Sequence, residues 1–238
     1  MQRDFYLVNY CRGIKIKVVL FDMDGVLYDS MPHHVRAWKE TMDACNVPST
    51  ERDFYLLEGR TGGTTIDYLF QRHFGHNATD KEKKEIYKKK AARFNELNNG
   101  QIMPGAKSVL QKVKESGLRA SVVTGSGQPA LLAKMERDFE EFIDPSKTVS
   151  AFDVKFGKPH PEPYLMALKA WNISPNEAIV IENAPLGIES AKAAGIFTVA
   201  VNTGRLEDEI LLAAGAGRIY PSMQALADDW GGVLNRFA

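Results

Sequence analysis

The sequence predicts an α/β protein: a doubly wound, Rossmann-like parallel sheet as core, with a small all-helical cap domain inserted after the first strand. Short apolar runs that end in polar or acidic residues recur along the chain, beginning with residues 18–21. Such runs are typical of buried parallel strands. The longest stretch of helical pattern lies between the first of these runs and all the others. We therefore expect residues 14–30 and 102–238 to form the core, and residues 31–101 to form the cap.

Length and composition limit the classes of protein that the chain can belong to. The 238 residues are enough for one large domain or for a core with a smaller second domain. Lysine plus arginine and aspartate plus glutamate both total 30, so the net charge is zero and neither nucleic acid nor an anionic membrane is an expected partner. Two cysteines, Cys11 and Cys45, exclude a disulfide framework and suit a reducing compartment. No apolar run approaches the roughly 20 residues of a membrane span, and the N-terminal extension at 1–13 lacks the apolar core of a signal peptide, so we expect a cytoplasmic monomer.

Two aspartates at the end of the first expected strand are the strongest candidates for chemistry. Asp22 and Asp24 follow four apolar residues, and side chains at positions i and i+2 of an extended chain share a face. Gly25 then allows a tight turn. Paired carboxylates repel unless a cation or a proton intervenes, so Mg²⁺ binding, nucleophilic attack and acid–base catalysis are all open to them. A surface turn or a helix cap uses the same residues, but the preceding apolar run and the further acid Asp29 make this pattern much narrower.

The expected cap begins with a helix at residues 31–45. Pro32 suits its first turn, and His34 shares a face with Trp38, close in sequence to the two aspartates. A histidine at this position either packs against the helix face or belongs to the site. A second helix is expected at 51–57.

A glycine-rich loop at residues 58–65 follows, with Arg60 as its one cation. Its three glycines predict a mobile loop. An anionic substrate would need such a cation, whereas an exposed arginine in a plain turn is the alternative. Two further helices are expected, and the last, at 81–90, mixes acids and bases at i,i+4 spacing, as in Lys81/Glu85, which indicates a solvated face.

The second expected strand, at residues 119–124, runs into a loop of small residues, Gly125 and Ser126, before a helix that Pro129 can open. Free N–H groups and the helix dipole make such a loop an anion site. The loop also matches G-x-G-x-x-A, a rough dinucleotide fingerprint, and an NAD-type oxidoreductase is therefore an alternative function. That fingerprint normally follows the first strand and precedes an acid that ends the next strand, and here Asp144 ends no convincing strand.

Two later segments carry further polar groups. Lys158 lies in a segment, 157–164, with three prolines at alternate positions, which stiffen it and keep the residues before them extended. A lysine there can offer a fixed charge to a phosphate. A strand expected at 178–181 ends in Glu182 and Asn183, whose side-chain oxygens can bind Mg²⁺. The remaining expected elements are a helix that carries Val109 and Val113 and ends near Gly117, a helix at 185–194, and strands at 198–202 and 218–220.

Residues 21–30, Phe-Asp-Met-Asp-Gly-Val-Leu-Tyr-Asp-Ser, resemble the first motif of the haloacid dehalogenase superfamily of phosphatases and phosphomutases. Residues 34–38, His-Val-Arg-Ala-Trp, resemble the segment that follows it in the β-phosphoglucomutase-like subgroup with a helical cap. The second, third and fourth motifs match in order at Thr124, at Lys158 with its prolines, and at 182–183. The resemblance covers nearly the whole chain, and four motifs in order are more specific than any one of them.

The resemblance implies Asp22 as the nucleophile that forms an aspartyl phosphate, Asp24 as acid and base, and Lys158 as the bridge between the nucleophile and the phosphoryl oxygens. Mg²⁺ would be held by the Asp22 carboxylate and the Asp24 backbone carbonyl, with Glu182 and Asn183 completing its site. The family normally ends the last of these strands with two acids. Asn183 is the main departure from that pattern, because an amide removes one negative charge from the metal site.

For the substrate, the resemblance implies a phosphate held by the Thr124 hydroxyl and by the N–H groups of Gly125 and Ser126. His34 would lie beside the acid/base aspartate, and Arg60 lies in the loop through which the cap of this family selects the substrate. The expected function is a Mg²⁺-dependent phosphatase that acts on a small phosphorylated metabolite, such as a sugar phosphate.

A mutase of the β-phosphoglucomutase type is the alternative implied by the same resemblance. A mutase has to grip a second phosphate, and the sugar-phosphate mutases do so with a cap-loop arginine and a basic residue in the second-motif loop. The aligned positions here hold Gly62 and Gly127, which favours hydrolysis, although Arg60 could partly replace the first. A non-catalytic binder of phosphorylated metabolites rests on Asn183 alone.

Overall fold

The computed structural model describes residues 15–237, so the expected extension at 1–13, with Cys11, lies outside the described residues. Its core is a five-stranded sheet in which every neighbouring pair of strands is parallel, in the order β2-β1-β3-β4-β5. The strands are β1 (Val18–Phe21), β2 (Arg119–Val122), β3 (Ala178–Glu182), β4 (Phe197–Val201) and β5 (Arg218–Tyr220). This topology confirms the doubly wound α/β core that the apolar runs predict.

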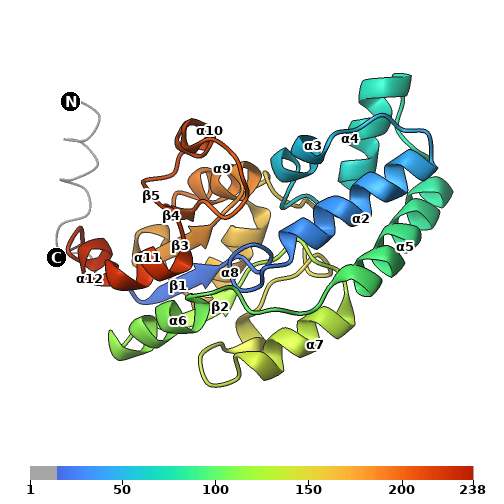
Figure 1. Ribbon diagram of the computed structural model, residues 1–238. Coiled ribbons are helices and arrows are strands. Elements are labelled where there is room, and N and C mark those ends of the chain that lie inside the picture. The colour runs from blue at the N-terminus through green and yellow to red at the C-terminus, as the bar shows by residue number, and fades with distance from the viewer. Residues whose placement is uncertain (1–14, 238) are drawn as a thin grey trace.

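Helices cover both faces of the sheet (Figure 1). Successive side chains of a strand point to opposite faces, so in β1 Phe21 belongs to one hydrophobic cluster and Leu20 to another. The cluster around Phe21 is completed by α6 (Ala106–Glu115), α7 (Pro129–Asp138), α11 (Met223–Asp228) and α12 (Trp230–Leu234). The cluster around Leu20 is completed by α8 (Glu162–Trp171) and α9 (Pro185–Ala193), with α10 (Asp208–Ala214) packed beside α9. Two 3₁₀ turns, Pro145–Lys147 and Pro175–Glu177, complete the core.

The strand order reverses at β1, which lies between β2 and β3. Phe21 of β1 pairs with Ile181 of β3, and Asp22 and Glu182 therefore leave the sheet side by side. Open α/β sheets bind their ligands outside the carboxyl ends of the strands at such a reversal. The topology thus brings Asp22, at the end of β1, and Glu182, at the end of β3, to one place.

Between β1 and α6 the chain forms four helices that we call the cap: α2 (Met31–Ala44), α3 (Glu51–Leu56), α4 (Gly62–Phe74) and α5 (Asp80–Leu97). Figure 1 shows them grouped apart from the helices that flank the sheet. They enclose a hydrophobic cluster of their own, with Trp38, Phe54, Leu69 and Ile86 among its members. Within residues 15–237, no helix combines the length and the apolar composition needed to cross a membrane.

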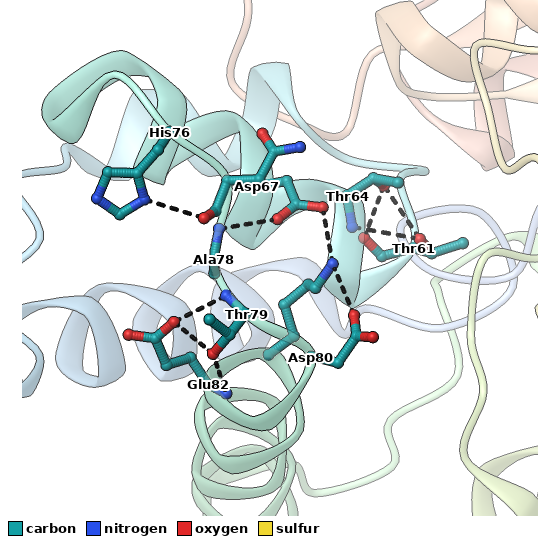
Figure 2. Close-up of polar contacts among 10 residues, drawn as sticks. Thr61, Thr64, Asp67, His76, Ala78, Thr79, Asp80 and Glu82 are labelled. Atoms are coloured by element: carbon teal, nitrogen blue, oxygen red, sulfur yellow. Dashed lines mark hydrogen bonds and ion pairs between the residues drawn. The ribbon is translucent and has the colours of Figure 1, made fainter.

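Two ion pairs that the charge pattern does not predict lie where α5 begins beside α4, and one of them joins the two helices (Figure 2). The Lys83 ammonium lies 3.2 Å from Asp67 of α4 and 3.2 Å from Asp80 of α5. The expected pair Lys81/Glu85 is not among the ion pairs of the described residues. Lys83 therefore joins two cap helices, where the sequence indicates only contacts along one of them.

Helix α4 begins at Gly62, inside the segment expected to be a mobile loop. The side chain of Thr61 caps its first turn by accepting a hydrogen bond from the backbone N–H of Thr64 (Figure 2). A Cβ atom at position 62 would lie 2.1 Å from the ring of Tyr87 in α5. Close packing of α4 against α5, rather than mobility, therefore explains this glycine.

Helix α8 begins at Glu162, inside the proline-rich segment that was expected to be extended. Pro163 lies in the first turn of the helix, where its missing N–H group would have no partner in any case. The residue before it is therefore helical. Lys158 precedes the helix, as expected, and its peptide bond to Pro159 is cis.

Candidate active site

Lys158 lies at the centre of a buried ionic cluster at the carboxyl ends of the strands. Its ammonium donates hydrogen bonds to Asp22 Oδ1 at 2.6 Å, to Glu182 Oε1 at 2.6 Å and to the backbone carbonyl of Val123 at 3.0 Å. The Tyr164 hydroxyl donates to the same Glu182 oxygen at 2.8 Å. The cluster collects residues from the ends of β1, β2 and β3 and from α8. Three sequence-predicted residues, Asp22, Lys158 and Glu182, therefore meet.

The charges in this cluster perturb one another. Burial raises the pKa of Asp22; Lys158 opposes that rise, and the carboxylates of Glu182 and Asp24 add to it. Burial alone would lower the pKa of Lys158, but Asp22 and Glu182 raise it well above its usual range. Lys158 is thus a fixed positive charge beside a carboxylate whose charged form is disfavoured, first by burial and then by the neighbouring carboxylates.

Asp24 has a different environment from Asp22. Its Oδ1 accepts a hydrogen bond from the Ser30 hydroxyl at 2.6 Å and lies 3.1 Å from His34 Nε2. Ser30 is the N-cap residue of α2 but makes no capping hydrogen bond with its side chain, because its hydroxyl is directed to Asp24. Burial raises the pKa of Asp24, yet the contacts with His34 and Ser30 outweigh it and lower the pKa overall.

Lys90 of α5 is a site residue that the sequence does not single out. It is 3% exposed, and its ammonium lies 2.6 Å from His34 Nδ1, whose ring stacks on Phe94 at 3.8 Å between centroids. Burial lowers the pKa of Lys90 to about 7. The helix was expected to present a solvated face, but Lys90 lies on its buried face, four residues from both Ile86 and Phe94. That spacing is the one sequence signal that could have identified it.

The loop after β2 differs in one detail from the expected phosphate site. Thr124 and Ser126 are buried and, with Gly125, line the same cavity as Asp22. The Ser126 N–H donates to Thr124 Oγ1 at 3.0 Å instead of pointing free, whereas Ser126 Oγ has no hydrogen-bond partner within the described chain. A Cβ at position 125 would lie 2.7 Å from the carbonyl oxygen of Gly59 in the cap. Only glycine fits this close approach of cap and core.

Asn183 faces a cap carboxylate, Glu58, that sequence reasoning did not single out. Asn183 Nδ2 donates to Glu58 Oε1 at 2.8 Å, and Asn183 Oδ1 is buried with no hydrogen-bond partner among residues 15–237. Gly25 makes this arrangement possible, since its φ is +81° and a Cβ there would lie 2.1 Å from Asn183 Nδ2. Burial raises the pKa of Glu58 well above its usual range, and the Asp22 carboxylate raises it further.

These groups fit a divalent cation. Besides burial, the Glu182 and Asp24 carboxylates raise the pKa of Asp22, and together with Asp22 they raise that of Glu58, which favours a positive ion between these groups. Both Glu182 oxygens already accept hydrogen bonds, so Asp22, Glu58 and the unpartnered Asn183 oxygen are the better placed donors. In the described part of the chain, no three His, Cys, Asp or Glu side chains could hold a metal by themselves. An amide oxygen is needed to complete the set, and Mg²⁺ accepts both kinds of oxygen.

A cavity of about 70 Å³ lies between the cap and these groups. Its polar lining includes both aspartates and the loop after β2, and its apolar lining is Met31, Val35, Trp38, Phe54 and Leu57. Tyr87 closes the cavity beside Gly62, where no larger residue fits. Drug-sized ligands occupy pockets of roughly 300–1,000 Å³, so with the cap in this position the site admits only a small leaving group.

Arg60 precedes α4, just before the N-cap residue Thr61. Its guanidinium stacks on the exposed ring of Tyr68, 5.3 Å from the ring centroid, and its Nε has no hydrogen-bond partner within the described chain. Arg60 also lines the cavity. Its charge is therefore near the site but is not directed at Asp22 by any contact of the described residues.

Known proteins resemble this chain in sequence and in fold. The haloacid dehalogenase-like hydrolase family matches residues 16–195. A "Phosphorylated carbohydrates phosphatase" of Thermotoga maritima is 31% identical over 203 residues, covering 84% of this chain and 92% of the relative. A "Beta-phosphoglucomutase" of Bacillus subtilis is 27% identical over 200 residues, covering 80% and 85%. A solved structure from Bacteroides vulgatus, named as a candidate beta-phosphoglucomutase, has a TM-score of 0.92 and 46% identity, and the match covers 98% of this chain and 96% of that one.

Proposed function

We propose that this chain, which belongs to the haloacid dehalogenase-like hydrolases and is a phosphohydrolase of that family, releases phosphate from a small phosphorylated carbohydrate or a similarly small metabolite with the help of Mg²⁺. The observation that carries the proposal is the 2.6 Å contact between Lys158 and Asp22 at a cavity that Asp24 also lines. The phosphatase from Thermotoga maritima supports the substrate class. The cytoplasm and a monomeric state remain expectations.

The proposed reaction has two steps on Asp22. Its carboxylate attacks phosphorus while the bond from phosphorus to the leaving oxygen breaks, and Lys158 neutralises the phosphoryl oxygens. Asp24 gives a proton to the leaving oxygen and then takes one from the water that cleaves the aspartyl phosphate. Because His34 and Ser30 lower the pKa of Asp24 in the free protein, the negative charge of the bound phosphate has to raise that pKa before Asp24 can donate.

In this proposal Asp22, Glu58 and Asn183 would hold Mg²⁺, together with the backbone carbonyl of Asp24. The ion would supply positive charge to the phosphoryl oxygens. Glu58 restores the negative charge that an amide at position 183 lacks. Glu182, whose oxygens are engaged by Lys158 and by backbone N–H groups, then serves to hold Lys158 in place.

A mutase remains the second candidate because of the similarity to the Bacteroides vulgatus structure. Position 62, which aligns with the arginine of the sugar-phosphate mutases, has no room for a side chain while Tyr87 stands beside it. Position 127 has ordinary space next to Phe152 but carries no charge. Neither position offers a grip for a second phosphate, which supports hydrolysis over transfer.

The test is phosphate release from a panel of phosphorylated metabolites, with Mg²⁺ and with chelator. The panel should include triose, pentose and hexose phosphates, nucleotides and pyrophosphate. The small cavity favours compact leaving groups, and this range of sizes tests that preference. We expect release that requires Mg²⁺ and that Asp22→Asn abolishes. Lys155→Met, which removes an exposed lysine near the site loop, is the matched control and should leave the rate unchanged.

Two outcomes would contradict the proposal. Conversion of hexose 1-phosphate to hexose 6-phosphate faster than phosphate release would establish the mutase. Tight binding of a metabolite without any turnover, in the presence of Mg²⁺, would make the protein a binder.

A further inference from the structure

The core contacts the cap at a second place, away from the catalytic residues. Leu206, in the loop between β4 and α10, is 6% exposed and belongs to the hydrophobic cluster of the cap. Every other buried member of that cluster comes from residues 31–86. Ile210, at the start of α10, packs against the same cluster. A core side chain therefore inserts into the cap's own hydrophobic interior.

An ion pair lies beside this apolar contact. The Arg52 guanidinium in α3 donates to both carboxylate oxygens of Glu207, at 3.1 Å and 2.8 Å. Such two-pronged contacts fix geometry as well as adding energy. Glu207 is the N-cap residue of α10, so the pair joins one cap helix to the beginning of one core helix.

The loop that carries these residues is braced against the core. Asn202 Nδ2 donates to the Leu206 carbonyl at 2.8 Å and to Asp208 at 2.6 Å. The Thr203 hydroxyl donates to the carbonyl of Gly25 at 2.6 Å, in the turn that follows Asp24. The same short loop thus contacts the cap on one side and the catalytic turn on the other.

We propose that Leu206 and Glu207 form a latch that holds the cap closed over the active site, with Arg52 as their partner in the cap. Helix α3 is followed almost directly by Glu58, so the latch fixes that carboxylate opposite Asn183. Opening the cap would expose Leu206 to water and separate the ion pair. The three residues act through the cap and are positioning residues. The kinetic part of this inference rests on the proposed function.

A charge swap tests the ion pair with the substrate that the panel identifies. Arg52→Glu and Glu207→Arg should each lower kcat/KM by roughly 2- to 5-fold, since exposed pairs contribute little. The double variant Arg52→Glu/Glu207→Arg should restore the wild-type value. Leu206→Ala should lower kcat/KM at least tenfold. Lys112→Glu, which disturbs an exposed pair within α6 alone, is the matched control and should change nothing.

Hydrogen–deuterium exchange gives a readout that needs no activity. The single variants and Leu206→Ala should speed exchange in α3 and in residues 203–207 without changing β1, and the double variant should return exchange to the wild-type rate. Unchanged exchange and unchanged kcat/KM in Leu206→Ala and both single variants would overturn the latch, as would a double variant that folds but is not rescued. If the wild-type protein released no phosphate at all, the proposed function would fail, and the exchange data alone would decide the latch.

Discussion

Replacing Lys158 with methionine should strongly destabilise the protein. Lys158 is 2% exposed, and its ammonium pairs with two carboxylates, Asp22 and Glu182, at 2.6 Å each. Methionine fills similar volume but leaves both carboxylates buried without a cation. Removing one partner of a buried ion pair costs about 3–5 kcal/mol, and two stranded carboxylates place the expected loss at the upper end of that range.

Urea denaturation in the presence of chelator measures this loss without interference from metal. At an m-value of about 3 kcal/mol/M the midpoint should fall by about 1–2 M. The loss should be smaller at pH 5 than at pH 8, because burial already raises the folded-state pKa of Asp22, and without Lys158 to oppose that effect the pKa would rise further above the unfolded value. Stability contributed by such groups is present at low pH and is lost as pH rises through the folded pKa.

Two further variants separate the ion-pair explanation from a packing defect. Adding Glu182→Gln to Lys158→Met removes one of the stranded charges and should recover part of the stability, whereas a packing defect would not be recovered. Lys155→Met, at an exposed lysine, should change the free energy of unfolding by no more than about 0.5 kcal/mol. A loss below about 1 kcal/mol at pH 8 for Lys158→Met would refute the reasoning.

Three other predictions follow from the site. Burial lowers the pKa of Lys90 from 10.5 to about 7, so the unfolded chain binds more protons between those pH values and the free energy of unfolding should rise with pH there. Lys90→Met should flatten that rise in urea titrations at pH 6, 7.5 and 9. An equal dependence of the free energy of unfolding on pH in both proteins would contradict the prediction. Asn183→Asp should lower the Mg²⁺ concentration for half-maximal activity, which a Mg²⁺ titration of phosphate release measures. It should also destabilise the metal-free protein by about 0.5–3 kcal/mol in thermal unfolding, since a carboxylate would then face Glu58 at about the 2.8 Å of the present contact. An unchanged Mg²⁺ dependence of activity would argue against a metal ligand at this position. Tyr87→Ala should raise kcat/KM for hexose phosphates relative to the smallest active substrate, because it opens the cavity beside Gly62; a uniform fall across the phosphate-release panel would show that Tyr87 does not limit substrate size.

The strand-end residues of the candidate active site could be predicted from the sequence because their signals are local. Each signal lies within a few residues of the sequence: an apolar run that ends in Asp22, a strand that ends in Glu182, and a lysine among prolines. The rule that parallel strands present their carboxyl ends at one edge then places them together. The structure has all three side chains in one hydrogen-bonded cluster around Lys158.

The residues that the cap contributes to the site could not be predicted from the sequence in the same way. Lys90 stands among exposed lysines in a charged helix, and only the packing of α5 against α2 buries it against His34. Glu58 is an ordinary acid in a loop until the cap approaches Asn183. In the sequence, Gly62 suggests a mobile loop. In the structure, the ring of Tyr87 occupies the space that a side chain at position 62 would need.

The sequence by itself thus determined the fold class, the order of the motifs and the identity of the residues at the strand ends. Periodicity and turn chemistry act over a few residues, and the topology of a parallel sheet follows from them. Only the tertiary structure decided which cap residues reach the site, how small the cavity is and where the cap is held. Those features depend on contacts between segments that are distant in sequence, such as His34 with Lys90, Glu58 with Asn183 and Arg52 with Glu207, and no local pattern encodes them.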